Sequence, residues 1–137
     1  MDAPDFERLF NAIPANYIVL DLDWKIVAIT ETALGGRPRA EVVGRSQFEV
    51  FPDNPDDPDA AGTATMLAAL QRVLTERAGH EMPVTRYDVA DASGVFREHH
   101  WKPVNEPVFD GQGEISHIIH GVVDVTDAVS ASGQAPE

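Results

Sequence analysis

Two long strand-like segments near the C-terminus, joined by a short turn, constrain the fold more than any other part of the chain. Residues 101–109 and 115–124 are rich in side chains that favour extended structure. The connection between them, residues 110–113, reads Asp-Gly-Gln-Gly and supplies the glycines of a tight reversal. The pattern predicts a β-hairpin, so the fold must contain a pair of long antiparallel strands.

Other segments of the chain also have the composition of strands. The candidates are residues 17–22, 25–29, 82–89 and 95–109, the last of which includes the first arm of the hairpin. Pro103 and Pro107 lie inside that segment. Because proline has no N–H to donate, each is expected at a bulge, a bend or a free edge. The chain therefore predicts five strands, and their hairpin-like connections favour an antiparallel sheet.

Helices are expected before the first strand and between the second and the third. One apolar stripe at helical spacing predicts a long helix over residues 63–77, and its members are Met66, Leu67, Leu70, Val73 and Leu74. An N-terminal helix within residues 1–14 is predicted by the spacing of Phe6, Leu9 and Phe10. We therefore expect an α+β fold with a five-stranded antiparallel sheet. Short helices and the long helix would cover one face, and the N-terminal helix would flank it.

Charge and composition exclude several classes of function. The 137 residues carry a net charge of -13, and the 10 lysine and arginine residues are scattered, which disfavours binding to nucleic acid or to an anionic membrane. No apolar stretch approaches the ~20 residues of a transmembrane helix, and no signal peptide is present, so a cytoplasmic protein is expected. The chain has no nucleophile elbow and no phosphate-binding loop, which disfavours an enzyme.

Four short motifs occur in the order found in one family of sensory domains. They are the candidate hairpin of residues 17–30, the turn Glu41-Val42-Val43-Gly44-Arg45, the Pro-Val-Phe-Asp-Gly-Gln-Gly-Glu-Ile stretch of residues 107–115, and the closing Asp124-Val125-Thr126. This ordered set resembles a PAS domain of the type fused to bacterial histidine kinases and other two-component signalling proteins. The resemblance covers residues 6–127.

The resemblance also implies a division of the chain. Residues 1–14 would form an N-terminal flanking helix, residues 15–127 the PAS domain, and residues 128–137 a disordered tail or a truncated linker. PAS domains typically have a cavity between the concave face of the sheet and the short helices, and strand alternation decides which side chains face it. The expected lining residues are Phe48, Phe51, Met66, Leu70, Tyr87, Trp101, Asn105, Ile118 and His120.

Two interpretations of this interior stay open. A few polar groups on otherwise apolar walls fit a site for a small molecule, but the same side chains can also fill the core completely. His120 can be a core histidine, a hydrogen-bonding group for a ligand, a pH sensor or a haem ligand. Haem is disfavoured because oxygen-sensing PAS domains carry the haem histidine on the long helix, and residues 63–77 contain none.

Other cofactors are also constrained by the residues present. The chain has no cysteine, which excludes flavin–thiol photochemistry and thiolate metal sites, so the cofactor stays unknown. Glu98 and His100 share one face of a strand and could bind a metal, but no further ligands are evident. Residues 53–59 form an acidic loop without the glycine and terminal glutamate of a calcium loop, so we expect a rigid turn with helix-capping aspartates.

The resemblance implies a sensory function. A small molecule or a partner would bias the packing of the sheet, and the signal would pass to a histidine kinase or another output domain through Asp124, Val125 and Thr126. The alternative is a ligand-independent dimerisation module, in which a homodimer forms through Phe6, Leu9 and Phe10. A small α+β enzyme is disfavoured because the helices lie in the middle of the strand order.

Overall fold

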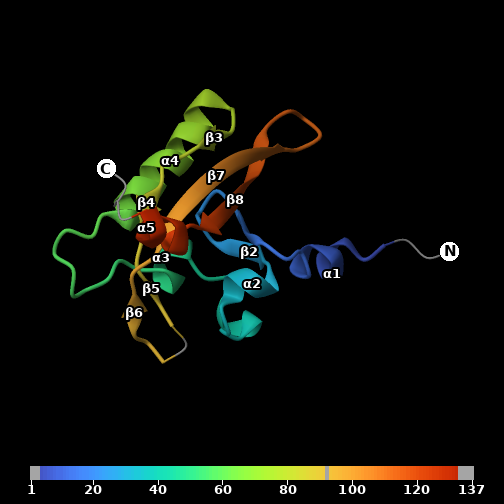
Figure 1. Ribbon diagram of the computed structural model, residues 1–137. Helices are drawn as coiled ribbons and strands as arrows, with labels where there is room; N and C mark the ends of the chain where they lie inside the picture. The colour runs from blue at the N-terminus through green and yellow to red at the C-terminus, as the bar shows by residue number, and fades with distance from the viewer. Residues whose placement is uncertain (1–3, 92, 133–137) are drawn as a thin grey trace.

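One antiparallel sheet lies at the centre of the protein (Figure 1). The structure is a computed structural model and describes residues 4–91 and 93–132. The strands follow the spatial order β2 (Ile26–Ile29), β1 (Asn16–Leu20), β8 (Ile115–Asp124), β7 (His100–Phe109) and β3 (His80–Glu81), and the short β4 (Thr85–Arg86) also pairs with β7. All of these pairings are antiparallel, which confirms the expected α+β class.

The predicted hairpin is confirmed as the pair β7–β8. In its turn, the Asp110 carboxylate accepts hydrogen bonds from the backbone N–H of Gln112 at 2.8 Å and of Glu114 at 3.1 Å. Gly113 has a φ of 78°, a conformation that glycine adopts without steric cost. The Asp110 side chain and Gly113 together define the turn, and the geometry of the turn sets the register of the two strands.

Both prolines of β7 face the outer edge of the sheet, away from β8. The carbonyl of Pro103 accepts a hydrogen bond from the N–H of Met82 at 2.9 Å, next to β3. In an antiparallel strand the N and C=O of one residue point to the same side, and every second residue repeats that direction. The nitrogens of Pro103 and Pro107 therefore point away from β8, so the central pair loses no hydrogen bond. Pro107 lies beyond the residues that pair with β3, at a free edge as the sequence allowed, whereas Pro103 lies at the gap in the ladder between β3 and β4.

The third expected strand, residues 82–89, is not continuous. In its place are β3, β4 and a separate hairpin of β5 (Val89–Ala90) with β6 (Phe96–Arg97). Pro83 follows β3 closely and cannot donate to a ladder, which accounts for the gap before β4. The expected strand over residues 95–109 is split as well, because its first part forms β6 and the rest forms β7. The β5–β6 hairpin extends away from the sheet (Figure 1).

Short helices and the long helix α4 (Gly62–Glu76) cover one face of the sheet. The short ones are α2 (Glu31–Leu34), the 3-10 helix η1 (Arg39–Glu41) and α3 (Gln47–Val50). The core between the two layers consists of Ile18, Leu20, Ile26, Ile29, Leu34, Val42, Met66, Leu70, Val73 and Ile118. Full burial of an aliphatic side chain of this size contributes about 1.5–3 kcal/mol to folding. The predicted stripe of α4 is confirmed, with Met66, Leu70 and Val73 buried.

The acidic loop before α4 caps that helix. The Asp53 carboxylate accepts hydrogen bonds from the backbone N–H of Thr63 at 3.0 Å and from its hydroxyl at 2.6 Å. A carboxylate in this position satisfies a free N–H and interacts favourably with the helix dipole. Ala61 occupies the N-cap position and has no capping side chain. The loop therefore supplies the cap from a distance, as expected of a helix-capping aspartate.

Helices at the two ends flank the sheet. None of the residues of α1 (Phe6–Asn11) is buried, and in Figure 1 this helix projects to one side of the body, where its C-terminal end contacts β2. The other helix, α5 (Thr126–Ser132), directly follows β8. We expected a tail or a linker from residue 128 onward; residues 128–132 form part of this helix, and residues 133–137 lie outside the described residues.

Candidate functional site

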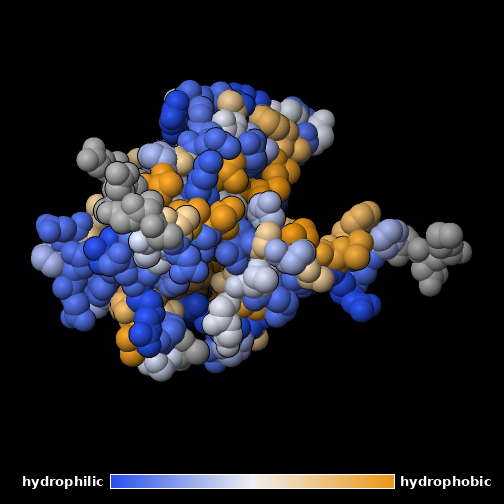
Figure 2. Space-filling view, viewed as in Figure 1, coloured by the Kyte–Doolittle hydropathy of each residue, from blue (hydrophilic) through white to orange (hydrophobic). Residues whose placement is uncertain are grey.

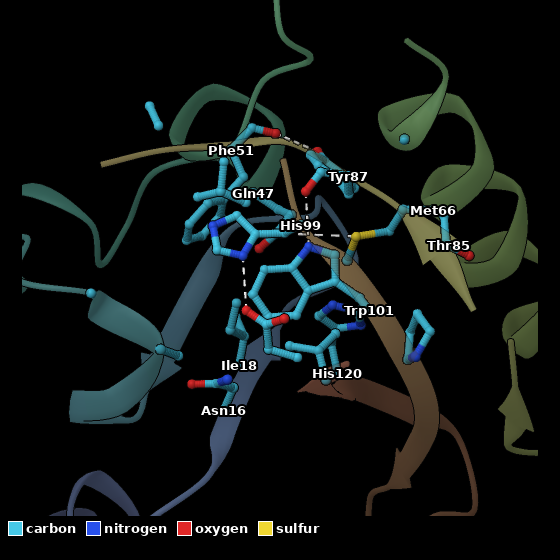
Figure 3. A pocket seen from close by; sticks show the side chains of 18 of the residues that line it. Asn16, Ile18, Gln47, Phe51, Met66, Thr85, Tyr87, His99, Trp101 and His120 are labelled. Carbon is cyan, nitrogen blue, oxygen red and sulfur yellow. Dashed lines mark hydrogen bonds and ion pairs between the residues drawn. The ribbon is translucent and has the colours of Figure 1, made fainter. Parts of the chain in front are cut away.

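A cavity of about 340 Å³ lies between the inner face of the sheet and the short helices. Strands β1, β7 and β8 form one wall, α2, α3 and the first turns of α4 form the opposite wall, and β4 and β5 lie at one side. Figure 3 shows the Trp101 indole in the middle of this space, with Met66 and Tyr87 on one side and His99 on another. The walls are mostly apolar, so the few polar groups among them decide what the cavity can recognise.

His120 lies in the sheet wall of the cavity and is only 5% exposed. Its Nδ1 is 2.7 Å from Oδ1 of Asn105. Because an amide oxygen can only accept, Nδ1 carries the proton and donates. The amide of Asn105 is held in turn by the sulfur of Met82, which accepts from Nδ2 at 3.4 Å. Burial lowers the pKa of His120 to about 4, so the ring is neutral at pH 7 and its Nε2 is an acceptor.

Gln47 reaches the cavity from the helical side. It is the buried residue of α3, and Ser46 caps that helix by accepting a hydrogen bond from the N–H of Phe48 at 3.2 Å. The Gln47 carboxamide donates weakly from Nε2 to the sulfur of Met66 at 3.8 Å (Figure 3). Its Oε1 is enclosed and has no hydrogen-bond partner in the described part of the chain. Because an unsatisfied buried acceptor costs about 1–3 kcal/mol, this wall gains from any donor brought to it.

Trp101 and Tyr87 bind backbone carbonyls with their polar atoms. Trp101 donates from Nε1 to the carbonyl of Tyr87 at 2.9 Å, and the Tyr87 hydroxyl donates to the carbonyl of Phe51. Burial, and then the charge of Asp53, raise the pKa of the Tyr87 hydroxyl, so it stays protonated. A Cβ at Gly62 would lie 2.6 Å from the Tyr87 ring, which therefore packs on the backbone of α4. Both aromatic groups offer apolar surface to the cavity.

One edge of the cavity reaches the end of β8. His99 stacks on Trp101 with ring centroids 5.2 Å apart, and its Nδ1 donates to Oδ2 of Asp124 at 2.8 Å. Asp124 also accepts from the backbone N–H of Thr126 at 2.9 Å. Burial alone would raise the pKa of Asp124, but the hydrogen bonds from Thr126 and His99 outweigh it, and the pKa is lowered. The carboxylate therefore connects the cavity wall to the first turn of α5.

The two arginines that line the cavity already have partners. Arg37 lies over the Phe51 ring, with 5.0 Å from the guanidinium carbon to the ring centroid, and it donates to the carbonyl of Ala90. Arg97 pairs with Asp91 at 3.2 Å. Among the described lining residues, Arg97 is thus paired with a carboxylate, whereas Arg37 is bound only to neutral groups, the carbonyls of Leu34 and Ala90 and the Phe51 ring.

The structure brings five of the nine expected lining residues to the cavity, namely Phe51, Met66, Tyr87, Trp101 and His120. The other four lie outside it, in the core or packed on it: Phe48, Leu70, Asn105 and Ile118. Strand alternation correctly puts Asn105 and Ile118 on the covered face, but the cavity extends over only one end of that face. Where the middle of α4 packs on the sheet, side chains fill the space. A filled core and a cavity are therefore both present, in different parts of the interior.

The expected lining set left out several residues of the cavity, among them the polar side chains of Gln47 and His99. Gln47 was missed because its polarity separates it from the apolar residues that follow, although Ser46 marks the start of a helical turn there. Strand alternation puts His99 on the inward face with Trp101, and the structure places it in the cavity wall. Its bond to Asp124 has no signal in the sequence, because 25 positions separate the two residues.

The structure also places the residues expected to carry a signal or a dimer contact. Asp124 ends β8, Val125 connects it to α5, and Thr126 is the first residue of that helix. On α1, Phe6 is 74% exposed and Leu9 is 56% exposed, whereas Phe10 is partly buried. The apolar side chains of Phe6 and Leu9 are therefore exposed in the described part of the chain.

The candidate metal ligands Glu98 and His100 bind each other, with 2.8 Å between Oε2 and Nε2. Within residues 4–91 and 93–132, no three His, Asp or Glu side chains are arranged to hold a metal ion. In the same part of the chain, no helix combines the length and the apolarity needed to cross a membrane.

An antiparallel sheet, short helices on one face and a cavity between the layers define the class of PAS-like sensory folds. The sequence model of that family, described as the PAS fold, matches residues 10–130. The chain belongs to the PAS fold family. No curated protein sequence matches the chain.

Three solved structures illustrate the similarity of fold. The PAS domain of a Colwellia psychrerythraea protein has a TM-score of 0.65 at 11% identity, over 88% of this chain and 93% of that chain. A sensory box sensor histidine kinase from Vibrio cholerae has a TM-score of 0.60 at 16% identity, over 88% and 87%. VqmA bound to DPO has a TM-score of 0.59 at 25% identity, over 85% of this chain but only 55% of VqmA.

Proposed function

We propose that this PAS domain is a sensor that binds a small molecule in the cavity beside Trp101 and has no catalytic step. The observation that carries the proposal is the cavity itself, about 340 Å³ in volume, with His120 and Gln47 on otherwise mostly apolar walls. Cavities of this size and composition are typical sites for small molecules. The similarity to VqmA, which has been solved bound to DPO, supports a ligand-binding role.

The proposed signal leaves through the contact between the cavity and the start of α5. A ligand against Trp101 changes the position of the His99 ring stacked on it, and with it the bond from His99 to Asp124. Next to that bond, the N–H of Val125 donates to the carbonyl of His100 at 2.8 Å. The output would be a histidine kinase or another partner that reads the position of α5.

Two neighbouring valines of β8 give a matched test. Val122 lines the cavity, whereas Val123 is 62% exposed. A chemical library would be screened against the purified chain by thermal denaturation, because a ligand that binds only the folded state raises the melting temperature. We expect Val122→Phe to fill the cavity and abolish the stabilisation by every hit, and Val123→Phe to retain it.

The opposite pattern would count against the proposal. A hit that stabilises the Val122→Phe variant as much as the wild type binds elsewhere on the protein. A library that stabilises neither the wild type nor Val123→Phe would leave the cavity without a ligand, and the sensory role would have to be abandoned in favour of protein contacts alone.

A second function, homodimerisation through α1, is favoured by a separate observation. Phe6 and Leu9 expose most of their apolar surface on a helix that projects to one side of the body. Figure 2 shows apolar residues along this helix, whereas polar residues cover the loop between α3 and α4 on the opposite side of the view. A second copy of the same helix is an occupant of matching chemistry, because such apolar surfaces usually mark interaction sites.

Light scattering of the purified chain tests the dimer. The double variant Phe6→Glu/Leu9→Glu should convert it to a monomer, since two carboxylates would face each other across the helix pair. Val43→Glu/Val95→Glu is the control, because it adds the same charge at exposed apolar residues away from α1. A wild type that is monomeric at all concentrations, or a dimer that survives the first double variant, would refute the α1 interface.

A further inference from the structure

The polar groups of the cavity differ in how much hydrogen-bonding capacity they have left. The donors of Trp101 and Tyr87 are already bound to backbone carbonyls, and the guanidinium groups of Arg37 and Arg97 have their own partners. Among the buried polar side chains of the lining, His120 and Gln47, the unused capacity is that of an acceptor. This asymmetry restricts the chemistry of a ligand.

The strongest unused acceptor is Nε2 of His120. The bond from Nδ1 to Asn105 fixes the tautomer, so Nε2 has a free lone pair and no proton. No described residue bonds to Nε2, and His120 lines the cavity. The neutral state of the ring, which follows from the lowered pKa of about 4, holds over the physiological pH range.

Gln47 supplies a second acceptor on the opposite wall. Its Oε1 is buried without a donor, and the side chain is only 3% exposed. The terminal torsion of a carboxamide is soft, so a small rotation brings Oε1 to the cavity surface. A ligand N–H at this position would satisfy an acceptor that the folded protein leaves unsatisfied.

Negative charge is disfavoured by the same surroundings. Asp91 and Asp124 line the cavity, and each is the partner of a basic side chain, Arg97 and His99 respectively. Arg37 is bound only to carbonyls and a ring, but an anionic ligand placed against His120 and Gln47 would lose its hydration to two acceptors that cannot donate to it. The net charge of -13 adds an unfavourable long-range field.

From this arrangement we infer that the ligand is an uncharged molecule that presents at least one N–H or O–H donor to His120, with Gln47 as a second acceptor. The inference rests on the proposed sensory function and specifies its ligand class. Carboxylates, phosphates and neutral molecules without a donor are the classes that these two acceptors disfavour.

Isosteric probes separate donor capacity from shape and charge. Benzamide, acetophenone and benzoate share one skeleton and end in NH2, CH3 and O⁻, and nicotinamide, 3-acetylpyridine and nicotinate repeat the series. Binding to the full chain would be measured at pH 7.5 by ligand-observed NMR titration. We expect each amide to bind at least tenfold more tightly than its ketone and its acid, a factor that corresponds to about 1.4 kcal/mol.

Histidine variants assign that preference to the proposed acceptor. His120→Phe keeps a ring of similar size but has no acceptor, and it should remove the preference of the protein for amide over ketone. His117→Phe is the matched control, because His117 lies on the opposite face of β8 from His120, and it should leave all affinities unchanged. Since His120→Phe also strips Asn105 of a hydrogen bond and can weaken the fold, Gln47→Met provides a second variant, in which the amide should lose severalfold in affinity.

A measurement on the wild type does not depend on any variant. In the nitrogen-15 spectrum of histidine-labelled protein at pH 7, His120 should carry its proton on Nδ1, and Nε2 should shift when benzamide binds. A proton on Nε2, a ketone that matches its amide, or an acid that binds more tightly than its amide would overturn the inference and leave the sensory proposal standing. If no member of either series binds to the wild type, the inference fails, and the library screen alone decides the sensory proposal.

Discussion

His99 and Asp124 join two strands where the chain leaves the sheet, with Nδ1 of His99 2.8 Å from Oδ2 of Asp124. The bond lies at the open end of the β7–β8 hairpin, the end farthest from the turn. The backbone of His100 makes two more hydrogen bonds at the same end. Its carbonyl accepts from the N–H of Val125 at 2.8 Å, and its N–H donates to the Thr126 hydroxyl at 2.9 Å. Three separate hydrogen bonds thus hold the start of α5.

Removal of the His99 bond should loosen α5 without unfolding the domain. His99→Phe keeps an aromatic ring that can stack on Trp101 but cannot donate to Asp124. A lost hydrogen bond of about 1 kcal/mol predicts roughly fivefold faster amide exchange across α5, measured by hydrogen–deuterium exchange. Asp124→Ala should have a larger effect, because it also removes the bonds from Thr126. His117→Phe is the control and should leave the exchange rate of α5 unchanged. If His99→Phe also exchanges at the wild-type rate, the bond from His99 to Asp124 does not hold α5.

The buried His120 should make stability depend on pH between about 6.5 and 4. In the folded protein burial lowers its pKa to about 4, whereas in the unfolded chain it is about 6.5. The unfolded chain therefore binds the proton first as the pH falls. The stability contribution is complete above the unfolded pKa and decreases until the pH reaches the folded pKa, with a total loss of roughly 3 kcal/mol.

Urea unfolding at several pH values between 7 and 4 measures this loss. The His120→Phe variant should start from a lower stability and show a shallower decline over the window. The lowered pKa of Asp124 acts in the same direction at lower pH, because its contribution to stability is present above the unfolded pKa of a carboxyl and is lost as the pH falls through the folded pKa. Equal slopes in the wild type and His120→Phe would show that another group dominates.

Gly62→Ala should destabilise the protein although alanine is the better helix former. The new Cβ would lie 2.6 Å from Cδ2 of Tyr87, so the ring must move and its hydroxyl bond to Phe51 is strained. We expect a net loss of about 1–3 kcal/mol from this overpacking, more than the ~1 kcal/mol that the propensity supplies. Gly111→Ala has open space around it and should change stability by less than about 0.5 kcal/mol in the same denaturation assay.

Asp53→Ala should remove the cap of α4. The substitution deletes both hydrogen bonds to Thr63, and caps of this kind contribute about 1 kcal/mol. Asp56→Ala in the same loop changes the charge equally but leaves the cap in place. Chemical denaturation of the two variants should therefore differ by about that amount, and identical midpoints would show that the loop does not stabilise the helix.

Local patterns were sufficient to predict much of the fold. The β7–β8 hairpin follows from two strand-like segments around Gly113, and α4 follows from the stripe that includes Met66 and Leu70. The third strand could not be predicted in detail. Pro83 and the pairing with β7 split it, and pairing partners distant in the sequence decide where such a strand is interrupted.

The cavity was only partly predictable for a related reason. Strand alternation assigns Trp101, Asn105 and His120 to the covered face, and the structure agrees. Alternation does not say how closely a helix packs over that face. Side chains of α4 fill the region around Ile118, whereas the end near Trp101 stays open, and that difference depends on the path of the connecting loops.

The amino-acid sequence by itself determined the order of the elements, the inward faces and the turn of the central hairpin, because periodicity, glycine and proline act over a few neighbouring residues. Only the tertiary structure decided that Gln47 keeps an unsatisfied oxygen, that His120 is fixed as an acceptor by Asn105, and that His99 bonds to Asp124. These relationships join residues far apart in the chain. Their geometry depends on how separate segments pack together, and no single segment contains the information that sets this packing.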